Sequence, residues 1–222
     1  MVFWLIAAAS GIAEEAKKPE GIEAQTSYAL GLNIGRGFQS QGIEIQNDVF
    51  LQGLNDGLKG SAPLLTDEEM RTAMETLRAE LEKKHLAKLE AMGKKNLEES
   101  EAFFAANKKE KGVVTLASGL QYKIEKKGTG NSPGKDDTVT VHYQGTLLDG
   151  QEFDSSVKRG QPATFKVGGV IAGWTEALQL MKEGAKWRLF IPPHLAYGER
   201  GRPPVILPNS ALIFDVELLK VN

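Results

Sequence analysis

Apolar and small residues recur at helical spacing in the first part of the chain. They share one helical face between residues 23 and 39, at Ala24, Tyr28, Gly31, Leu32, Gly35 and Phe38. This period predicts a helix. Leu30 and Ile34 lie on the opposite side, so the helix is apolar nearly all round and is expected to be buried on both sides. Because glycine costs a helix about 1 kcal/mol per residue, Gly31 and Gly35 are expected to let another helix approach closely.

A second short helix is predicted to begin at Asn47, acting as N-cap, and to end at Gly60. Its apolar positions are Phe50, Leu51, Leu54 and Leu58. Two short helices cannot bury apolar surface on both sides by themselves. The segment 14–65 is therefore predicted to form a two-fold homodimer with a second copy of itself. Packing of this helix pair onto the rest of the same chain is the alternative.

The segment 66–111 predicts one long helix. Thr66 and Glu69 form a capping box at its start, and an apolar stripe follows at Met70, Met74, Leu77 and Leu81. Lys84 and Lys88 then interrupt the stripe. The many charged residues in this segment predict a mostly solvated connecting helix, held by ion pairs at helical spacing. A coiled coil is the alternative, although the interrupted heptad disfavours it.

After Lys111 the pattern changes from helical period to strand alternation. Apolar residues alternate in predicted strands at Val139, Val141 and Tyr143, at Trp187, Leu189 and Ile191, and at Leu212, Phe214, Val216 and Leu218. Asp149-Gly150 predicts a hairpin turn, and residues 174–181 a short helix whose apolar side faces the sheet. The segment 112–222 is therefore predicted to be an α+β domain with an antiparallel sheet and one packed helix.

Composition removes several kinds of chemistry. The chain has no cysteine, which excludes disulfides, thiol nucleophiles and thiolate metal sites. Its 3 histidines are scattered without ligand spacing, so no metal or cofactor is expected. A net charge of −2 disfavours binding to nucleic acid. Gly128-Thr129-Gly130 precedes a predicted strand instead of a helix, which removes the phosphate-loop interpretation.

Residues 1–13 are uncharged and mostly apolar, and small residues follow at Ser10, Gly11 and Ala13. This pattern is typical of the back half of a secretory signal, although the basic region that usually precedes the apolar run is missing. The segment 1–13 is therefore interpreted as a truncated signal peptide, with a short anchor or a frayed tail as the alternative. The run is far shorter than the about 20 residues that span a bilayer as a helix.

Five motifs in the last 110 residues or so resemble the FKBP-type peptidyl-prolyl isomerase domain, in the order in which that family carries them. They are Val141-His142-Tyr143-Gln144-Gly145, Phe153-Asp154-Ser155-Ser156, Val170-Ile171-Ala172-Gly173-Trp174, Leu195-Ala196-Tyr197-Gly198, and the segment 212–218. The N-terminal helices, with Tyr28-Ala29-Leu30-Gly31, resemble the macrophage infectivity potentiator branch of the family. The resemblance implies an antiparallel sheet wrapped around a short helix, with an apolar pocket between them.

The resemblance also implies roles for the pocket residues. Those assigned to catalysis are Asp154, Tyr197, Phe153 and Ile171, and those assigned to substrate binding are Tyr143, Val170, Trp174, Ile206 and Phe214. Trp174 would be the floor and Ile206 a lip, while the Tyr197 hydroxyl and the Ile171 N–H would bind substrate carbonyls. By pattern alone, Tyr143, Trp174 and Phe214 would be core residues and Asp154 a turn residue.

Two charged residues near these motifs have open interpretations. Arg159 either pairs with Asp154 or is solvated. Arg202 lies in the long loop between Tyr197 and Ile206, where its charge could shift substrate preference.

The resemblance predicts an exported, dimeric peptidyl-prolyl cis-trans isomerase, or rotamase, that acts on X-Pro bonds of folding polypeptides. It would also act as a chaperone through its helical domain over 14–65, and FKBP-pocket macrolides such as FK506 or rapamycin would inhibit it. The expected location is the periplasm or outer cell envelope of a Gram-negative-type bacterium. A non-catalytic proline-binding chaperone or interaction module is the alternative.

Overall fold

A computed structural model describes residues 17–222 of the chain. The predicted signal segment, residues 1–13, lies outside the described residues. The chain divides into two compact units, one up to Glu82 and one over Lys83–Asn222. No helix within residues 17–222 has the length and apolarity needed to cross a membrane.

The first unit contains α1 (Ile22–Gln41), α2 (Asn47–Lys59) and the start of α3 (Asp67–Asn107). Phe38 of α1 packs edge-on against Phe50 of α2, with ring centroids 5.5 Å apart. The N-cap of α2 is Gln46 and not Asn47, and its side chain makes no capping hydrogen bond. Sequence analysis placed this cap one residue late because Asn is a frequent capping residue.

The apolar surface of α1 and α2 stays largely uncovered in the described chain. No residue of either helix is buried, and Tyr28, Leu30 and Leu54 expose 60%, 59% and 46% of their surface. Apart from the adjacent residues and the nearby backbone of α1 itself, no atom of residues 17–222 comes within 4 Å of the position that a Cβ would take at Gly31 or Gly35. The close helix approach expected at these glycines is therefore not made within the described part of the chain.

The capping box at the start of α3 is confirmed. The backbone N–H of Thr66 donates to Glu69 Oε2 at 2.8 Å, and the Glu69 N–H donates to Thr66 Oγ1 at 3.2 Å. The hydrogen bonds from Thr66 lower the pKa of Glu69 below its usual value. The helix continues unbroken to Asn107.

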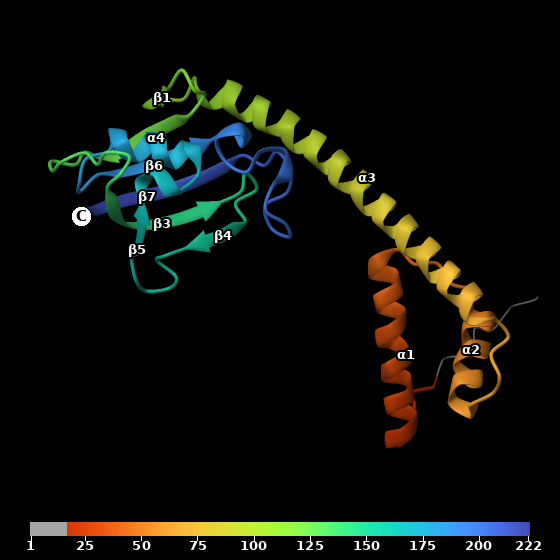
Figure 1. Ribbon diagram of the computed structural model, residues 1–222. Helices are drawn as coiled ribbons and strands as arrows, with labels where there is room; N and C mark the ends of the chain where they lie inside the picture. Colours follow the sequence, from red (N-terminus) through yellow and green to blue (C-terminus); the bar gives the residue numbers. More distant parts are fainter. Residues whose placement is uncertain (1–16) are drawn as a thin grey trace, which may run out of the picture. The chain divides into compact units, whose positions relative to one another are not determined.

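The second unit contains the rest of α3 and an antiparallel sheet of seven strands, on which the short helix α4 (Ala172–Leu180) packs (Figure 1). The strands are β1 (Val113–Thr115), β2 (Gln121–Lys126), β3 (Thr138–Thr146), β4 (Glu152–Ser155), β5 (Ala163–Lys166), β6 (Lys186–Ile191) and β7 (Leu212–Val221). Their order is β1-β2-β6-β7-β3-β4, and β5 pairs with β3. The predicted fold class, N-terminal helices followed by an antiparallel sheet with a short helix, is confirmed.

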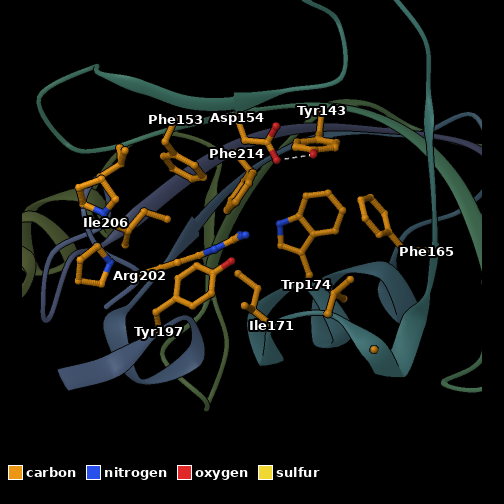
Figure 2. A pocket seen from close by; sticks show the side chains of 15 residues that line it. Tyr143, Phe153, Asp154, Phe165, Ile171, Trp174, Tyr197, Arg202, Ile206 and Phe214 are labelled. Atoms are coloured by element: carbon orange, nitrogen blue, oxygen red, sulfur yellow. Dashed lines mark hydrogen bonds between the residues drawn. The ribbon is translucent and has the colours of Figure 1, made fainter. Parts of the chain in front are cut away.

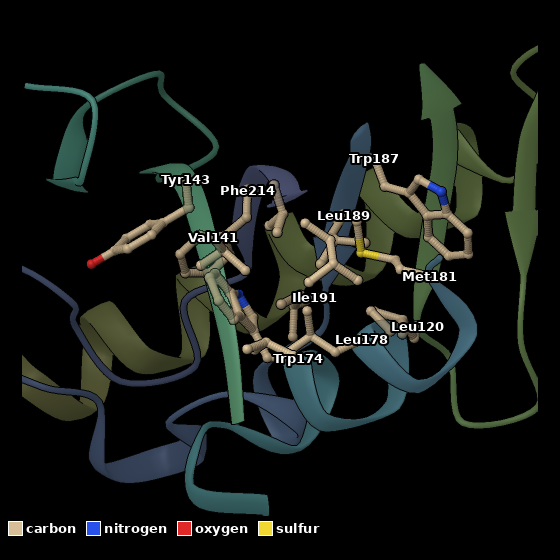
Figure 3. Packing of buried hydrophobic residues seen from close by; sticks show 14 of the residues in the cluster. Leu120, Val141, Tyr143, Trp174, Leu178, Met181, Trp187, Leu189, Ile191 and Phe214 are labelled. Atoms are coloured by element: carbon tan, nitrogen blue, oxygen red, sulfur yellow. The ribbon is translucent and has the colours of Figure 1, made fainter. Parts of the chain in front are cut away.

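The core lies between α4 and the sheet (Figure 3). Leu178 of α4 and the following Met181 are fully buried. They face Val141, Leu189 and Ile191 from the alternating positions of β3 and β6. The period of two in these strands directs apolar side chains to one face, which explains why the sequence pattern predicted this layer.

Most of α3 is exposed, as predicted for a solvated connecting helix, but its last turns pack on the sheet. Asn107 donates from Nδ2 to Gln121 Oε1 of β2 at 2.8 Å, and Gln121 Nε2 donates to the Phe104 carbonyl at 3.0 Å. Phe103 packs on Phe190 of β6 with ring centroids 5.8 Å apart. This end of α3 therefore belongs to the compact unit that contains the sheet.

α3 also contacts the loop that precedes β7. Asn96 Nδ2 donates to the Pro208 carbonyl at 2.8 Å, and Asn209 Nδ2 donates to the Gly93 carbonyl at 3.2 Å. A Cβ at Gly93 would lie 3.0 Å from Pro208 Cβ, so the absence of a side chain lets the loop lie close against the helix. Ser100, only 1% exposed, completes this contact through a hydrogen bond of 3.4 Å to the Asn209 carbonyl.

Candidate functional site

A cavity of about 790 Å³ opens on the second unit, beside α4 and β3. All the residues that the resemblance assigned to a pocket line it together: Tyr143, Phe153, Asp154, Val170, Ile171, Trp174, Tyr197, Ile206 and Phe214. Figure 2 shows these side chains converging on one space from β3, β4, β7, the start of α4 and the loop after β6. The fold thus brings together residues that the sequence spreads over more than seventy positions.

The inner wall of the cavity is aromatic. Trp174, in the first turn of α4, meets Tyr143 of β3 and Phe214 of β7 edge-on, with ring centroids 5.3 and 5.2 Å apart. Phe153 in turn meets Phe214 at 5.4 Å. Strand β3 gives these rings space at Gly145, where a Cβ would come within 2.7 Å of both Phe153 and Phe214.

Trp174 carries a buried hydrogen-bond donor without an acceptor. Its side chain is only 4% exposed, and Nε1 has no hydrogen-bond partner among residues 17–222. Figure 2 shows the nitrogen edge of the indole facing the cavity. Buried donors are nearly always paired. A ligand in the cavity could supply the missing acceptor, so this N–H marks the wall against which a ligand would bind.

Asp154 lies at the edge of the cavity in a network of hydrogen bonds. The Tyr143 hydroxyl donates to Asp154 Oδ2 at 2.5 Å, and Arg159 forms an ion pair with Asp154 Oδ1. Arg159 Nη2 also donates to the Tyr143 hydroxyl oxygen at 2.8 Å. Of the two interpretations of Arg159, pairing with Asp154 is therefore correct.

This network fixes the charge at the cavity edge. Burial by itself would raise the pKa of Asp154, but the hydrogen bonds from Tyr143 and Arg159 outweigh it and hold the pKa below its usual value. Burial raises the pKa of Tyr143, and the hydrogen bond to the Asp154 carboxylate adds to that shift. At neutral pH the site contains a carboxylate and a neutral phenol, so neither is poised to transfer a proton.

Two polar groups on the opposite side have no partner within residues 17–222. The backbone N–H of Ile171, just before α4, and the Tyr197 hydroxyl make no hydrogen bond there, although the Ile171 carbonyl accepts from the backbone N–H of Trp174 at 2.9 Å. Figure 2 shows Ile171 and Tyr197 on the same side of the cavity. The arrangement offers two donors to an extended peptide above an apolar wall.

Six lining residues were not assigned to the pocket by sequence analysis: Phe165, Gly169, Arg202, Pro203, Pro204 and Val205. Phe165 packs edge-on against Trp174 with ring centroids 5.8 Å apart. It shares its strand face with Ala163, so the alternation in β5 could have identified it. Gly169 ends a single 3₁₀ turn and the other four residues lie in the loop after β6, and such segments carry no periodic signal.

Comparison with known proteins gives matches over nearly the whole described chain. A family described as FKBP-type peptidyl-prolyl cis-trans isomerase matches residues 129–219, and the domain amino-terminal to such isomerases matches residues 23–124. The outer membrane protein MIP of Legionella longbeachae is 48% identical over 196 residues, 88% of this chain and 84% of that protein. The peptidyl-prolyl cis-trans isomerase Mip of Coxiella burnetii is 47% identical over 88% of this chain and 85% of its own length.

A solved structure shows the same relationship. The crystal structure of FkpA from Escherichia coli superposes with a TM-score of 0.75 at 39% identity, covering 91% of this chain and 98% of that one. The similarity therefore includes the helices as well as the sheet.

Proposed function

The chain belongs to the FKBP-type peptidyl-prolyl cis-trans isomerase family, and we propose that the cavity beside Trp174 is where it isomerises X-Pro bonds. The prolyl ring would pack against Trp174, with Tyr143, Val170, Ile206 and Phe214 as further substrate contacts. The groups proposed to act on the twisted bond are Asp154, Tyr197, Phe153 and Ile171. The observation that carries this assignment is that two donors beside an aromatic wall, Tyr197 Oη and Ile171 N–H, have no partner in the described part of the chain.

The physical basis of the reaction is the loss of amide resonance. Rotation about a peptide bond faces a barrier of about 18–20 kcal/mol, and for X-Pro the two isomers are close in energy, so that speed is what a catalyst must supply. The twisted bond is less polar than the planar one, so an apolar cavity stabilises the transition state more than the ground state. Fixed donors hold the flanking carbonyls in the twisted arrangement without reorganising.

Asp154 contributes through position and charge in this mechanism. Its carboxylate is held by Tyr143 and Arg159, and its lowered pKa keeps it ionised at neutral pH. The carboxylate therefore keeps the Tyr143 ring in the wall and sets the electrostatic potential at the cavity edge. Isomerisation only interrupts the partial double bond of the amide and then restores it, so no proton needs to move.

The deciding experiment is an isomerisation assay on a proline tetrapeptide, with rapamycin or FK506 as competitors for the cavity. Catalysis that these macrolides abolish, and that a Trp174→Ala variant loses while remaining folded, would support the assignment. Tight macrolide binding without acceleration would favour the alternative, a proline-binding chaperone or interaction module.

A further part of the proposal concerns the first unit. The uncovered apolar residues of α1 and α2 support a homodimer through residues 14–65, because two-sided apolar helices need a partner. A dimer would present two cavities to one unfolded client and gain avidity without tight binding at either site. We propose chaperone activity on this basis, tested by suppression of aggregation with the cavity blocked by rapamycin.

The last part of the proposal concerns cellular location, which we place outside the cytoplasm. A relative is named an outer membrane protein, and the apolar segment over residues 1–13 has the pattern of a signal. Both support the periplasm or outer cell envelope. Cell fractionation with N-terminal sequencing of the recovered protein tests location and cleavage together, and recovery from the cytoplasm with the N-terminus intact would contradict it.

A further inference from the structure

Arg202 extends into the cavity from its lip. Figure 2 shows the guanidinium pointing from the loop after β6 toward the centre of the lining residues, on the side of Tyr197 and Ile206. Every other lining residue except Asp154 is uncharged at neutral pH. Arg202 therefore brings a permanent positive charge to a site that is otherwise apolar.

The loop fixes where this side chain starts. The Arg202 N–H donates to the Ile206 carbonyl at 2.6 Å, and the Ile206 N–H donates back to the Arg202 carbonyl at 3.2 Å. Gly201 adopts a φ of 61°, and a Cβ there would lie 2.5 Å from the Ile206 carbonyl oxygen. Because Gly201 is the residue that permits this tight turn, the backbone of Arg202 is held at the lip.

The charge of Arg202 is not balanced within the described chain. Asp154, the acidic residue of the cavity, is engaged by Arg159 and by the Tyr143 hydroxyl. No carboxylate of residues 17–222 lies within 4 Å of the Arg202 guanidinium, and its side chain makes no hydrogen bond there. With Asp154 and Arg159 neutralising each other, Arg202 is the one uncompensated charge among the residues that line the cavity.

We propose that Arg202 makes the enzyme select X-Pro segments that carry a carboxylate side chain directly beside the proline. This inference rests on the proposed cavity as the substrate site. When the proline packs against the aromatic wall, the side chains of its neighbours lie toward the lip, within reach of the Arg202 guanidinium. A carboxylate there can form two parallel hydrogen bonds with the guanidinium, whereas a lysine is repelled.

The expected preference is moderate because the lip is open to solvent. An Arg–carboxylate pair at a partly exposed site should raise kcat/KM by about threefold to tenfold over the neutral isostere. The preference should weaken in 1 M salt, where the Debye length falls to about 3 Å. Both properties separate a charge effect from a steric one.

The test uses two peptide series around one proline, with Glu, Gln, Leu or Lys either before or after it. Isomerisation is measured on the full chain by NMR exchange, which needs no coupling protease with a charge preference of its own. The wild type should favour Glu over Gln in at least one series, Arg202→Gln should abolish that ratio, and Arg202→Glu should favour Lys. Arg200→Gln is the matched control, since Arg200 is exposed and outside the cavity lining.

The outcomes distinguish the role of Arg202 from the assignment of the cavity as the substrate site. Turnover of the Leu-Pro peptide with equal rates for Glu and Gln would overturn the role of Arg202 and leave the cavity assignment intact. An unchanged Glu-to-Gln ratio in Arg202→Gln would also overturn it. Turnover that survives saturating rapamycin would instead contradict the assignment of the cavity, on which the Arg202 proposal depends.

Discussion

The side chain of Asn96 on α3 donates a hydrogen bond of 2.8 Å to the carbonyl of Pro208, a residue 112 positions later in the chain. Pro208 lies two residues after Ile206, which lines the cavity. The second half of α3 thereby holds the loop from which Arg202 and Ile206 reach the site.

We predict that Asn96→Ala loosens this loop. Loss of the hydrogen bond should lower the free energy of unfolding by about 1 kcal/mol, measured by urea denaturation. Because the chemistry is untouched, the variant should raise KM for a proline peptide while kcat changes little. Glu98→Ala, an exposed change on the same helix, is the control; a KM equal to wild type in Asn96→Ala would contradict a role for this contact at the site.

Tyr197→Phe isolates one proposed donor. The Tyr197 hydroxyl makes no hydrogen bond within residues 17–222, so its removal should leave thermal stability unchanged. Since one hydrogen bond that strengthens in the transition state is worth about 1 kcal/mol or more, kcat/KM should fall about fivefold to tenfold. Tyr122→Phe, whose ring stacks on Trp187 away from the cavity, should have no effect. Equal activity of the two variants would remove Tyr197 from the mechanism.

Asp154 should give stability a specific pH dependence. Its folded-state pKa is lowered, so its contribution is present above the unfolded value of about 3.9 and is lost as pH falls through the folded pKa. We expect the melting temperature of the wild type to exceed that of Asp154→Asn at pH 7, and the gap to close as the pH is lowered below 4. A gap that stays constant down to pH 2 would show that the carboxylate charge is not the stabilising element.

The dimer is tested by placing charge on the uncovered face of α1. Leu30→Glu combined with Ile34→Glu should give a monomer in analytical ultracentrifugation, because two carboxylates cannot be buried between helices. Peptide isomerisation should persist while suppression of aggregation declines. Lys94→Glu, an exposed change of equal net charge on the second unit, controls for charge alone. A full-length wild type that sediments as a monomer would refute the dimer.

The sequence allowed the elements of the fold to be predicted more fully than the site. Alternation in β3 and β7 and the helical period around Thr66 are local patterns, so the strands and the capping box follow from them. The same patterns class Tyr143 and Phe214 as ordinary core residues. Only the order of several motifs along the chain, through the family resemblance, pointed to a cavity between them.

Side-chain contacts that no periodic pattern encodes could not be predicted in this way. The pairing of Asp154 with Arg159 depends on side-chain directions around a turn, and sequence analysis left it open. The contact of Gly93 with Pro208 joins a charged helix to an irregular loop, and neither segment carries a pattern that indicates the other. Both contacts arise from the assembled fold.

The indole of Trp174, whose N–H has no partner within residues 17–222, is an intrinsic fluorescent probe of the cavity. Trp187, stacked on Tyr122 with ring centroids 4.3 Å apart, does not line the cavity, and its emission, together with that of Trp4 outside the described residues, forms the background. A ligand in the cavity changes the polarity beside the Trp174 ring and can offer its nitrogen an acceptor. Its emission spectrum can therefore follow occupancy of the cavity in the unmodified protein, at equilibrium and in a stopped-flow instrument.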